Sequence, residues 1–332
     1  MKLSTDPVAL GCMMMGTTMD EQTSFSVLDH FLGEGLSHLD TANCYAWWVG
    51  TGEHVGDESE ACLGRWMKRR KNRNRLYLAT KAGGRLKDPR SIRDASGIPR
   101  WGEVRANYEG ASRSVLKGAL EGSLRRLGTD RIDLYYVHVD DPHTPLEETL
   151  ETLHGFVTQG FVGALGYSNV CAQRLVQIRD LCQTNQWTLP VAVQQEFSYL
   201  SPRPNLDRGI VHYADARIRS TLTPTQTLVA YSPLLKGLYT SEAKRQSVPL
   251  WAEYDHPESQ EKLKVLGRVS QETGMEPNAL VLAWILHQQP RVVPVLGFAT
   301  QAQFRANLAA VENSGRLSEE VFRQMSGGHG GW

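Results

Sequence analysis

Cysteine is scarce in this sequence, and none of it is spaced for a metal or a redox pair. The 332 residues include Cys12, Cys44, Cys62, Cys171 and Cys182, and no two of them form a C-x-x-C pair. An odd number without that spacing argues against a disulfide framework, a zinc ribbon and a redox pair, and it fits a reducing compartment. We therefore expect a cytoplasmic protein without a metal site.

Long hydrophobic runs and an excess of charge of one sign are also lacking. The longest uninterrupted apolar stretch, residues 279–286, is far shorter than the roughly 20 residues of a membrane-spanning helix. Thirty-six basic side chains balance 36 acidic ones, which gives no electrostatic case for nucleic acid or an anionic membrane as a partner. The basic run at residues 68–75 resembles a nucleic-acid patch, but no aromatic residue interrupts it. We interpret it as the solvated end of a helix.

Short apolar runs alternate with amphipathic stretches almost from one end of the chain to the other. The runs are rich in Val, Ile, Leu and Tyr and almost uncharged, which is typical of strands buried on both faces of a parallel sheet. They span residues 8–12, 38–41, 76–80, 132–138, 163–166, 191–194, 227–231 and 291–296. Helical patterns cover residues 21–34, 108–127, 146–159, 172–183, 259–273, 277–287 and 301–312.

This repeated alternation favours a closed (β/α)8 barrel, the TIM barrel, over an open sheet. We expect one barrel domain over residues 1–325 and a flexible glycine-rich tail over residues 326–332. Three long irregular stretches, residues 46–57, 83–107 and 236–257, would be enlarged loops of the barrel. Loops that follow strands lie on the face where barrel enzymes hold their active sites.

Four polar residues fall at or just past the ends of the second, third and fourth predicted strands: Asp40, Tyr45, Lys81 and His138. A barrel would bring these ends together at one mouth. A Tyr hydroxyl has an ordinary pKa of about 10 and needs a neighbouring cation to donate a proton near neutrality. Lys81 could supply that charge, held by Asp40, and His138 could orient a carbonyl oxygen or share the proton. Such a set would polarise a carbonyl group and leave room for a hydride donor.

Seven segments of the chain resemble, in the same order, the motifs of the aldo-keto reductases. They are residues 40–45 (DTANCY), 56–64, 79–81, 120–127 with 132–138, 166–169, 193–194 and 231–234. The resemblance extends from about residue 8 to about residue 311, and seven motifs in order are far more specific than one. By this resemblance the chain is identified as a bacterial, sugar- or polyol-oxidoreductase-like member of that superfamily.

The resemblance implies an enzyme that transfers a hydride between NAD or NADP and a carbonyl or alcohol group of a small molecule. It implies Tyr45 as general acid in reduction, with Lys81 and Asp40 tuning it and His138 placing the carbonyl. The cofactor-binding residues that it implies are Met14, Asp40, Ser168, Asn169, Gln194, Tyr231, Ser232, Pro233, Leu234, Lys236, Gly237, Gly297, Phe298, Thr300, Gln303 and Asn307. No G-x-G-x-x-G is present, and this family needs none because its cofactor lies across the barrel mouth.

The segment at residues 297–307 departs from the family pattern. NADP-preferring members usually carry a Lys or Arg before the Asn, because a 2′-phosphate is best held by a cationic fork. Gly297, Phe298, Thr300 and Gln303 are uncharged, and Arg305 lies outside the expected place. This favours NAD slightly, although some members hold the phosphate with Ser and Gln.

An insertion after the catalytic tyrosine places two adjacent tryptophans, Trp47 and Trp48, in a predicted active-site loop, and Trp101 lies in another such loop. Aromatic faces pack well on the apolar faces of sugar rings. We therefore expect Tyr45, Trp47, Trp48 and His138 to bind the substrate, a sugar, sugar-like compound or polyol. Packing of the two tryptophans within the loop, or in an oligomer contact, is an equally good interpretation.

Two other functions remain open at this point. One is a regulatory protein of the same family that binds the cofactor and turns over slowly. The other is a barrel hydrolase or lyase that uses Asp and Glu without a nicotinamide. Cys44, next to Tyr45, is interpreted as a small packed side chain rather than a redox-sensitive one.

Overall fold

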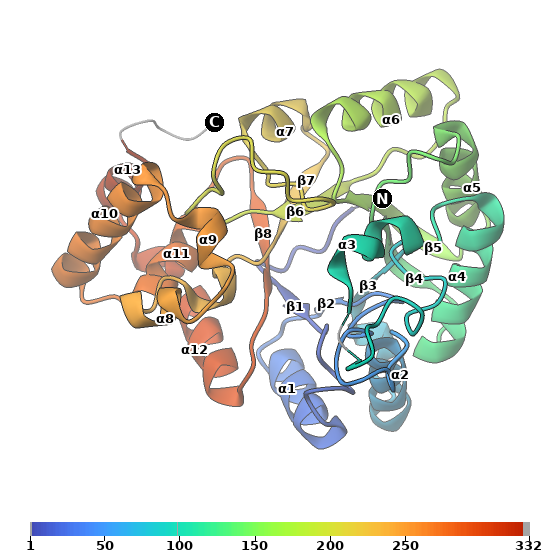
Figure 1. The fold of residues 1–332 in the computed structure, drawn as a ribbon, viewed down its shortest axis with the longest axis horizontal. Helices are drawn as coiled ribbons and strands as arrows, with labels where there is room; N and C mark the ends of the chain where they lie inside the picture. Colours follow the sequence, from blue (N-terminus) through green and yellow to red (C-terminus); the bar gives the residue numbers. More distant parts are fainter. Residues whose placement is uncertain (1, 98, 328–332) are drawn as a thin grey trace. The chain divides into compact units, whose positions relative to one another are not determined.

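The computed structural model describes residues 2–97 and 99–327, and its strands close into a barrel in chain order (Figure 1). The strands are β1 Ala9–Gly11, β2 His38–Asp40, β3 Tyr77–Ala82, β4 Ile132–Val137, β5 Val162–Ser168, β6 Ala192–Glu196, β7 Thr227–Tyr231 and β8 Val292–Leu296. Strands β2, β6 and β8 are buried along their whole length, as strands covered on both faces must be. The predicted (β/α)8 barrel is confirmed.

Helices alternate with these strands. The longer ones are α1 Glu21–Gly33, α2 Glu58–Arg70, α4 Arg113–Leu127, α5 Leu146–Thr158, α6 Ala172–Thr184, α10 Pro257–Thr273, α11 Pro277–Leu286 and α12 Gln301–Glu312. Shorter pieces are α3 Trp101–Val104, α7 Ala216–Thr221, α8 Glu242–Gln246, α9 Trp251–Tyr254, α13 Glu319–Met325, and the 3₁₀ turns η1 Arg73–Arg75, η2 Arg105–Asn107, η3 Leu235–Gly237 and η4 Ser314–Arg316. Of the three long irregular stretches, those at 83–107 and 236–257 contain short helices, and each stretch follows a strand.

One predicted helix begins later than its pattern indicated. The pattern covers residues 108–127, but α4 begins at Arg113, and Ser112 before it is extended. Tyr108 instead forms an antiparallel bridge with Leu86, and Gly110 has a positive φ of 81°. A hydrogen bond from Glu109 N to the Arg85 carbonyl (2.9 Å) holds this segment against the loop after β3, which outweighs its helical pattern.

Helix α2 carries the basic run in its last turn, which supports its interpretation as a helix end. Lys68, Arg69 and Arg70 lie there, and Lys71 ends the helix in a left-handed conformation. Cations at this place complement the partial negative charge of the helix C-terminus. Arg70 is also paired with Asp29 at 2.5 Å, so part of the basic charge is used within the fold.

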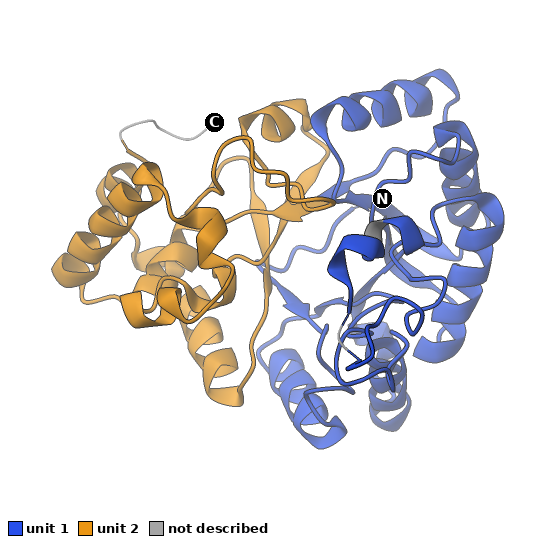
Figure 2. Ribbon diagram, in the orientation of Figure 1, with its two compact units in different colours: residues 1–193 blue, residues 194–332 orange. Residues whose placement is uncertain are grey.

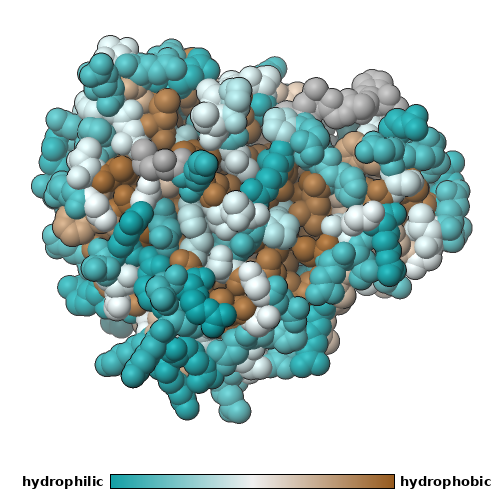
Figure 3. Space-filling view, turned by 180° about the vertical axis from the view of Figure 1, so that it is seen from behind, coloured by the Kyte–Doolittle hydropathy of each residue, from teal (hydrophilic) through white to brown (hydrophobic). Residues whose placement is uncertain are grey.

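The chain divides into two compact units, residues 1–193 and residues 194–332 (Figure 2). The first unit contains β1 to β5 with α1 to α6, and the second contains β7, β8 and the later helices. On the face shown in Figure 3, hydrophilic residues cover much of the surface, and hydrophobic residues show between them. Over residues 2–97 and 99–327, none of the helices combines the length and the apolar character that crossing a bilayer requires. Part of the predicted tail, residues 328–332, lies outside the described residues.

Candidate active site

Two neighbouring strands of the first unit, β2 and β3, bring the side chains of Asp40 and Lys81 together. Asp40 is the last residue of β2 and pairs in register with Ala79 of β3, and Lys81 lies two residues further along β3. Both side chains are buried, with exposed fractions of 2% and 0%. A lysine ammonium without solvent must be paired and hydrogen-bonded, or its burial would be very costly.

The Lys81 ammonium has three hydrogen-bond acceptors, one for each of its protons. It pairs closely with Asp40 Oδ1, and it donates to the Thr41 carbonyl oxygen at 2.9 Å and to Tyr45 Oη at 2.7 Å. An ammonium group has three donors and no acceptor, so the tyrosine oxygen accepts in this contact. The Tyr45 hydroxyl proton is therefore directed away from Lys81 and can be donated elsewhere.

His138 completes the group at the end of β4. Its backbone is held on both sides: His138 N donates to the Ala82 carbonyl at 2.7 Å, and Asn169 Nδ2 donates to the His138 carbonyl at 3.0 Å. Its ring meets the Tyr45 ring edge to face, with centroids 5.5 Å apart. Burial and the Lys81 charge lower the pKa of His138 to about 3, so the imidazole is neutral near neutrality. The structure thus brings together the four polar residues predicted from the strand ends.

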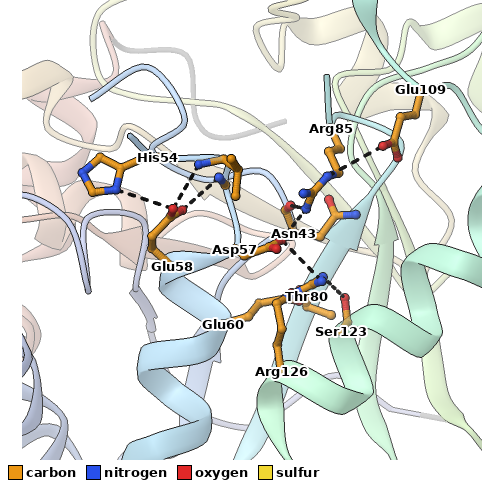
Figure 4. Close-up of polar contacts among 12 residues, drawn as sticks. Asn43, His54, Asp57, Glu58, Glu60, Thr80, Arg85, Glu109, Ser123 and Arg126 are labelled. Carbon is orange, nitrogen blue, oxygen red and sulfur yellow. Dashed lines mark hydrogen bonds and ion pairs between the residues drawn. The ribbon is translucent and has the colours of Figure 1, made fainter. Parts of the chain in front are cut away.

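A second layer of charged residues supports the segment that carries Tyr45 (Figure 4). Arg85 donates to the Asn43 carbonyl at 3.1 Å and is closely paired with Asp57 just before α2. Asp57 also accepts from Arg126 of α4, at 3.3 Å, and Arg126 reaches the fully buried Glu60 at 2.7 Å. Sequence reasoning included Asp57 and Glu60 in a family-like segment but gave neither a role, because their partners are distant in the chain.

The two-tryptophan insertion is anchored to the loop after β3. Arg93 donates to the Gly50 carbonyl at 2.9 Å and to the Trp47 carbonyl, and its guanidinium lies 5.8 Å from the Trp47 ring centroid. Trp47 is 4% exposed and packs with Leu86, Ile92 and Val104, whereas Trp101 is 60% exposed. The Trp101 ring lies 5.6 Å from Trp47 and 6.5 Å from Trp48, so the three indoles form one cluster. Arg93 was not among the predicted site residues.

The predicted cofactor residues lie within strands, at strand ends or in the segments that follow them. In the first unit, Ser168 ends β5, and Asn169 after it has a positive φ of 51°. In the second unit, Gln194 lies in β6 and Tyr231 ends β7. The remaining predicted positions are Met14 in the turn after β1, residues 232–237 after β7, and residues 297–307 in the loop after β8 and the first part of α12. Non-glycine residues with positive φ are uncommon and gather at functional sites.

Comparison with known proteins agrees with this geometry. The sequence model of the aldo/keto reductase family matches residues 7–327, and the chain belongs to this family. An uncharacterized oxidoreductase, YrpG of Bacillus subtilis, is 28% identical over 98% of this chain and 92% of its own length. Norsolorinic acid reductase stcV of Emericella nidulans is 29% identical over 93% of this chain and 75% of its own length. Aldo-keto reductase yakc of Schizosaccharomyces pombe, whose name includes NADP(+), is 26% identical over 96% of this chain and 86% of its own length.

The chain is therefore an oxidoreductase of the aldo-keto reductase class. Members of this class use NAD(P)H to reduce carbonyl groups of small molecules.

Proposed function

We propose that this protein transfers a hydride between a nicotinamide cofactor and the carbonyl or alcohol group of a sugar, a sugar-like compound or a polyol. The observation that carries the proposal is the Lys81 ammonium, whose three protons all have acceptors and whose contact with Tyr45 Oη at 2.7 Å directs the tyrosine proton away from Lys81. In reduction Tyr45 donates that proton to the carbonyl oxygen as it becomes an alkoxide. The Lys81 charge, held by Asp40, then stabilises the phenolate, and the reverse transfer serves alcohol oxidation.

The cofactor would supply the hydride, and the residues present fit such a group. In the first unit, Ser168 has a hydroxyl and Asn169 an amide oxygen suited to the nicotinamide carboxamide, while Asn169 Nδ2 is bonded to the His138 carbonyl. In the second unit, Gln194 has an amide suited to the same group and Tyr231 has a ring for stacking. Positive φ values at Ser232, Leu235 and Lys236 (53°, 44° and 56°) give the turn after β7 a backbone of the kind that forms anion-binding nests. This supports residues 232–237 as the pyrophosphate segment.

We propose NAD rather than NADP as the preferred cofactor. At the start of α12 the Thr300 side chain accepts from Gln303 N at 3.2 Å, and Gln303 Oε1 accepts from Ala299 N at 2.8 Å. Asn307 Nδ2 donates to the Gly297 carbonyl at 3.1 Å. These side chains therefore shape the loop. The only cation within residues 297–307 is Arg305, which lies outside the place where the family holds a 2′-phosphate.

Titration of the protein with NADH and NADPH, side by side, tests the cofactor assignment. Quenching of tryptophan fluorescence reports binding, because eight tryptophans are present. Tighter binding of NADH supports the proposal. Tighter binding of NADPH overturns the preference and assigns the 2′-phosphate to Gln303, Arg305 or another residue. Binding of neither nucleotide overturns the reductase function.

The sugar or polyol substrate rests on the indole cluster. Within it Trp48 is partly buried and Trp101 is exposed, so these rings have faces left for a ligand, while the burial of Trp47 favours a packing role for that residue. Trp48→Ala should raise KM for a good sugar substrate about tenfold, since an aromatic contact contributes about 0.5–1.5 kcal/mol beyond its area. The KM for a short aliphatic aldehyde serves as control and should stay unchanged. Equal KM values for the sugar in both proteins contradict the sugar assignment.

We further propose that the protein works in the cytoplasm. The support is its cysteine content: all five thiols are free, and four of them are buried within the fold.

A further inference from the structure

The Cys44 thiol contacts the imidazole of His138. Its Sγ lies 3.3 Å from His138 Nδ1, although the two residues are 94 positions apart in the chain. The Cys44 side chain is 5% exposed. This contact gives the residue next to Tyr45 a polar partner inside the candidate active site, beyond the packing role expected from the sequence.

The backbone around Cys44 is fixed from several sides. Asn43 N donates to the Lys81 carbonyl at 3.1 Å, and the Asn43 carbonyl accepts from Arg85 at 3.1 Å (Figure 4). Gly56 packs directly on Cys44: a Cβ at Gly56, where φ is 102°, would lie 2.8 Å from Cys44 Cα. The position of the thiol is therefore set by the fold, and it does not depend on a free loop.

The other partner is fixed as well. Both backbone groups of His138 are hydrogen-bonded, as described above, and Gly84 packs against the ring, where a Cβ would lie 3.0 Å from Nδ1. Protein thus fills the space beside Nδ1. Among the described residues, the Cys44 thiol is the side chain that hydrogen-bonds to this nitrogen.

The protons at this contact can be counted. Burial raises the pKa of the Cys44 thiol to about 12, and the pKa of His138 is lowered to about 3, so near neutrality both groups are uncharged. Sulfur then carries one proton, and the imidazole carries one proton on either Nδ1 or Nε2. A thiol is a weak donor and its sulfur a weak acceptor, whereas the unprotonated ring nitrogen is the more basic atom and the good acceptor of the pair. The better hydrogen bond therefore runs from the thiol to Nδ1.

We propose that Cys44 is a positioning residue that holds His138 in the tautomer protonated at Nε2. In that tautomer Nε2 donates a hydrogen bond, and it can place a carbonyl oxygen for the Tyr45 proton. The opposite tautomer would present an acceptor nitrogen, which repels a carbonyl oxygen. The catalytic consequence rests on the proposed function, but the tautomer does not.

Nitrogen NMR of the imidazole tests the tautomer directly in the protein with uniform ¹⁵N labelling at pH 7. His138→Asn identifies the His138 signals among those of the ten histidines. We expect Nδ1 to show the shift of an unprotonated nitrogen and Nε2 that of a protonated one. The reverse assignment in the unsubstituted protein overturns the proposal without any variant at Cys44.

Two variants and a matched control test the role of the thiol. Cys44→Ala should mix the two tautomers and lower kcat for reduction of glyceraldehyde about 3- to 10-fold, which is the size of one neutral hydrogen bond. Cys44→Ser keeps a donor and should restore both the tautomer and most of kcat. Cys182→Ala removes another buried cysteine, whose Sγ donates to the Thr188 carbonyl at 3.6 Å, and should change neither the tautomer nor kcat.

The outcomes separate this proposal from the proposed function. An unchanged tautomer and an unchanged kcat in Cys44→Ala overturn the positioning role. A tautomer that changes in Cys44→Ala, in a protein that reduces no carbonyl compound, supports the assignment of Cys44 and overturns the proposed function.

Discussion

At the scale of single residues, Lys81 combines two properties that mutagenesis can separate. It is fully buried, and it touches both Asp40 and the Tyr45 oxygen. Lys81→Met should lower the free energy of unfolding by about 3–5 kcal/mol, because it leaves the Asp40 charge buried without its partner. Tyr45→Phe removes only a hydroxyl and should reduce turnover at least about 100-fold, the contribution of a general acid.

Urea unfolding and a nicotinamide absorbance assay measure the two effects in the same pair of variants. Tyr45→Phe should lower the free energy of unfolding by about 1–3 kcal/mol, less than Lys81→Met, because it leaves one proton of the buried Lys81 ammonium without its acceptor. A Tyr45→Phe protein with full turnover, or a Lys81→Met protein of full stability, would contradict this division of roles.

His138 should make the protein sensitive to acid. Its pKa is about 3 in the folded protein, whereas an unperturbed histidine has a pKa of about 6.5. Between these values the unfolded chain binds a proton that the folded protein does not, so stability rises with pH across this window. The contribution of His138 is thus fully present above pH 6.5 and is lost as pH falls from 6.5 toward 3. Urea unfolding at pH 7 and pH 5 should therefore show a smaller decrease for His138→Asn than for the unsubstituted protein. Equal decreases in the two proteins would show that His138 titrates normally.

The sequence predicted the four central side chains because each lies at or just past the end of an apolar run, and a barrel brings those ends together. Cys44, Gly84, Arg85 and Arg93 could not be assigned in this way. Their contacts with His138, Asn43 and Trp47 depend on how two irregular loops fold, and no periodicity encodes that. The family-like segment at residues 56–64 was a signal for Asp57 and Glu60, but their partners Arg85 and Arg126 appear only in space.

At the scale of elements, the close approach of α2 and α4 depends on one glycine. A Cβ at Gly64 of α2 would lie 2.0 Å from the Arg126 carbonyl oxygen in α4, so the two backbones are nearly in contact there. Gly64→Ala should lower the free energy of unfolding by about 1–3 kcal/mol, because the helices must move apart. Gly118→Ala is the matched control: that glycine lies inside α4 with open space around its Cβ position.

The control should change stability in the opposite direction. Alanine favours the helix over glycine by up to about 1 kcal/mol, so Gly118→Ala should stabilise the protein. Thermal unfolding of both variants measures the difference. Destabilisation of similar size in both would mean that the contact at Gly64 is not what limits the approach of the helices.

The strands and most of the long helices, whose stability comes from their own pattern, were predicted, whereas α2 and the short helices were not. The strands follow from runs of Val, Ile and Leu, and all eight runs became strands. Helices α3, α8 and α9 have four or five residues, too few to outweigh the cost of helix nucleation alone. Helix α9 is held from outside, since Arg203 N donates to the Glu253 carbonyl at 2.8 Å and Arg208 Nε reaches the Glu253 carboxylate at 2.6 Å. The spacing of apolar residues along the chain does not predict contacts of this kind.

At the scale of the whole molecule, the reactivity of the five thiols measures which parts of the fold are accessible to solvent. Cys171 is exposed, whereas Cys12, Cys44, Cys62 and Cys182 are buried. A thiol reagent such as DTNB should therefore label one thiol quickly in the native protein and all five in denaturant. Cys171→Ser should remove the fast reaction entirely. More than one fast thiol in the native protein would mean that a buried cysteine is exposed by local opening.

The slow labelling of the four buried thiols then measures ligand binding without any assay of turnover. A buried thiol reacts only after the structure around it opens, so a ligand that binds the folded protein alone lowers the rate in proportion to its saturation. A nicotinamide nucleotide at 100 times its Kd should slow labelling about 100-fold wherever opening requires the ligand to leave. Cys44 lies beside Tyr45 and should be protected in this way, and mass spectrometry of the labelled peptides identifies it. Loss of protection at Cys44 alone, with the other three thiols still protected, would show that the segment around Cys44 opens while the nucleotide remains bound. We do not expect this result, because the hydrogen bonds of Asn43 to Lys81 and Arg85 hold that segment in place.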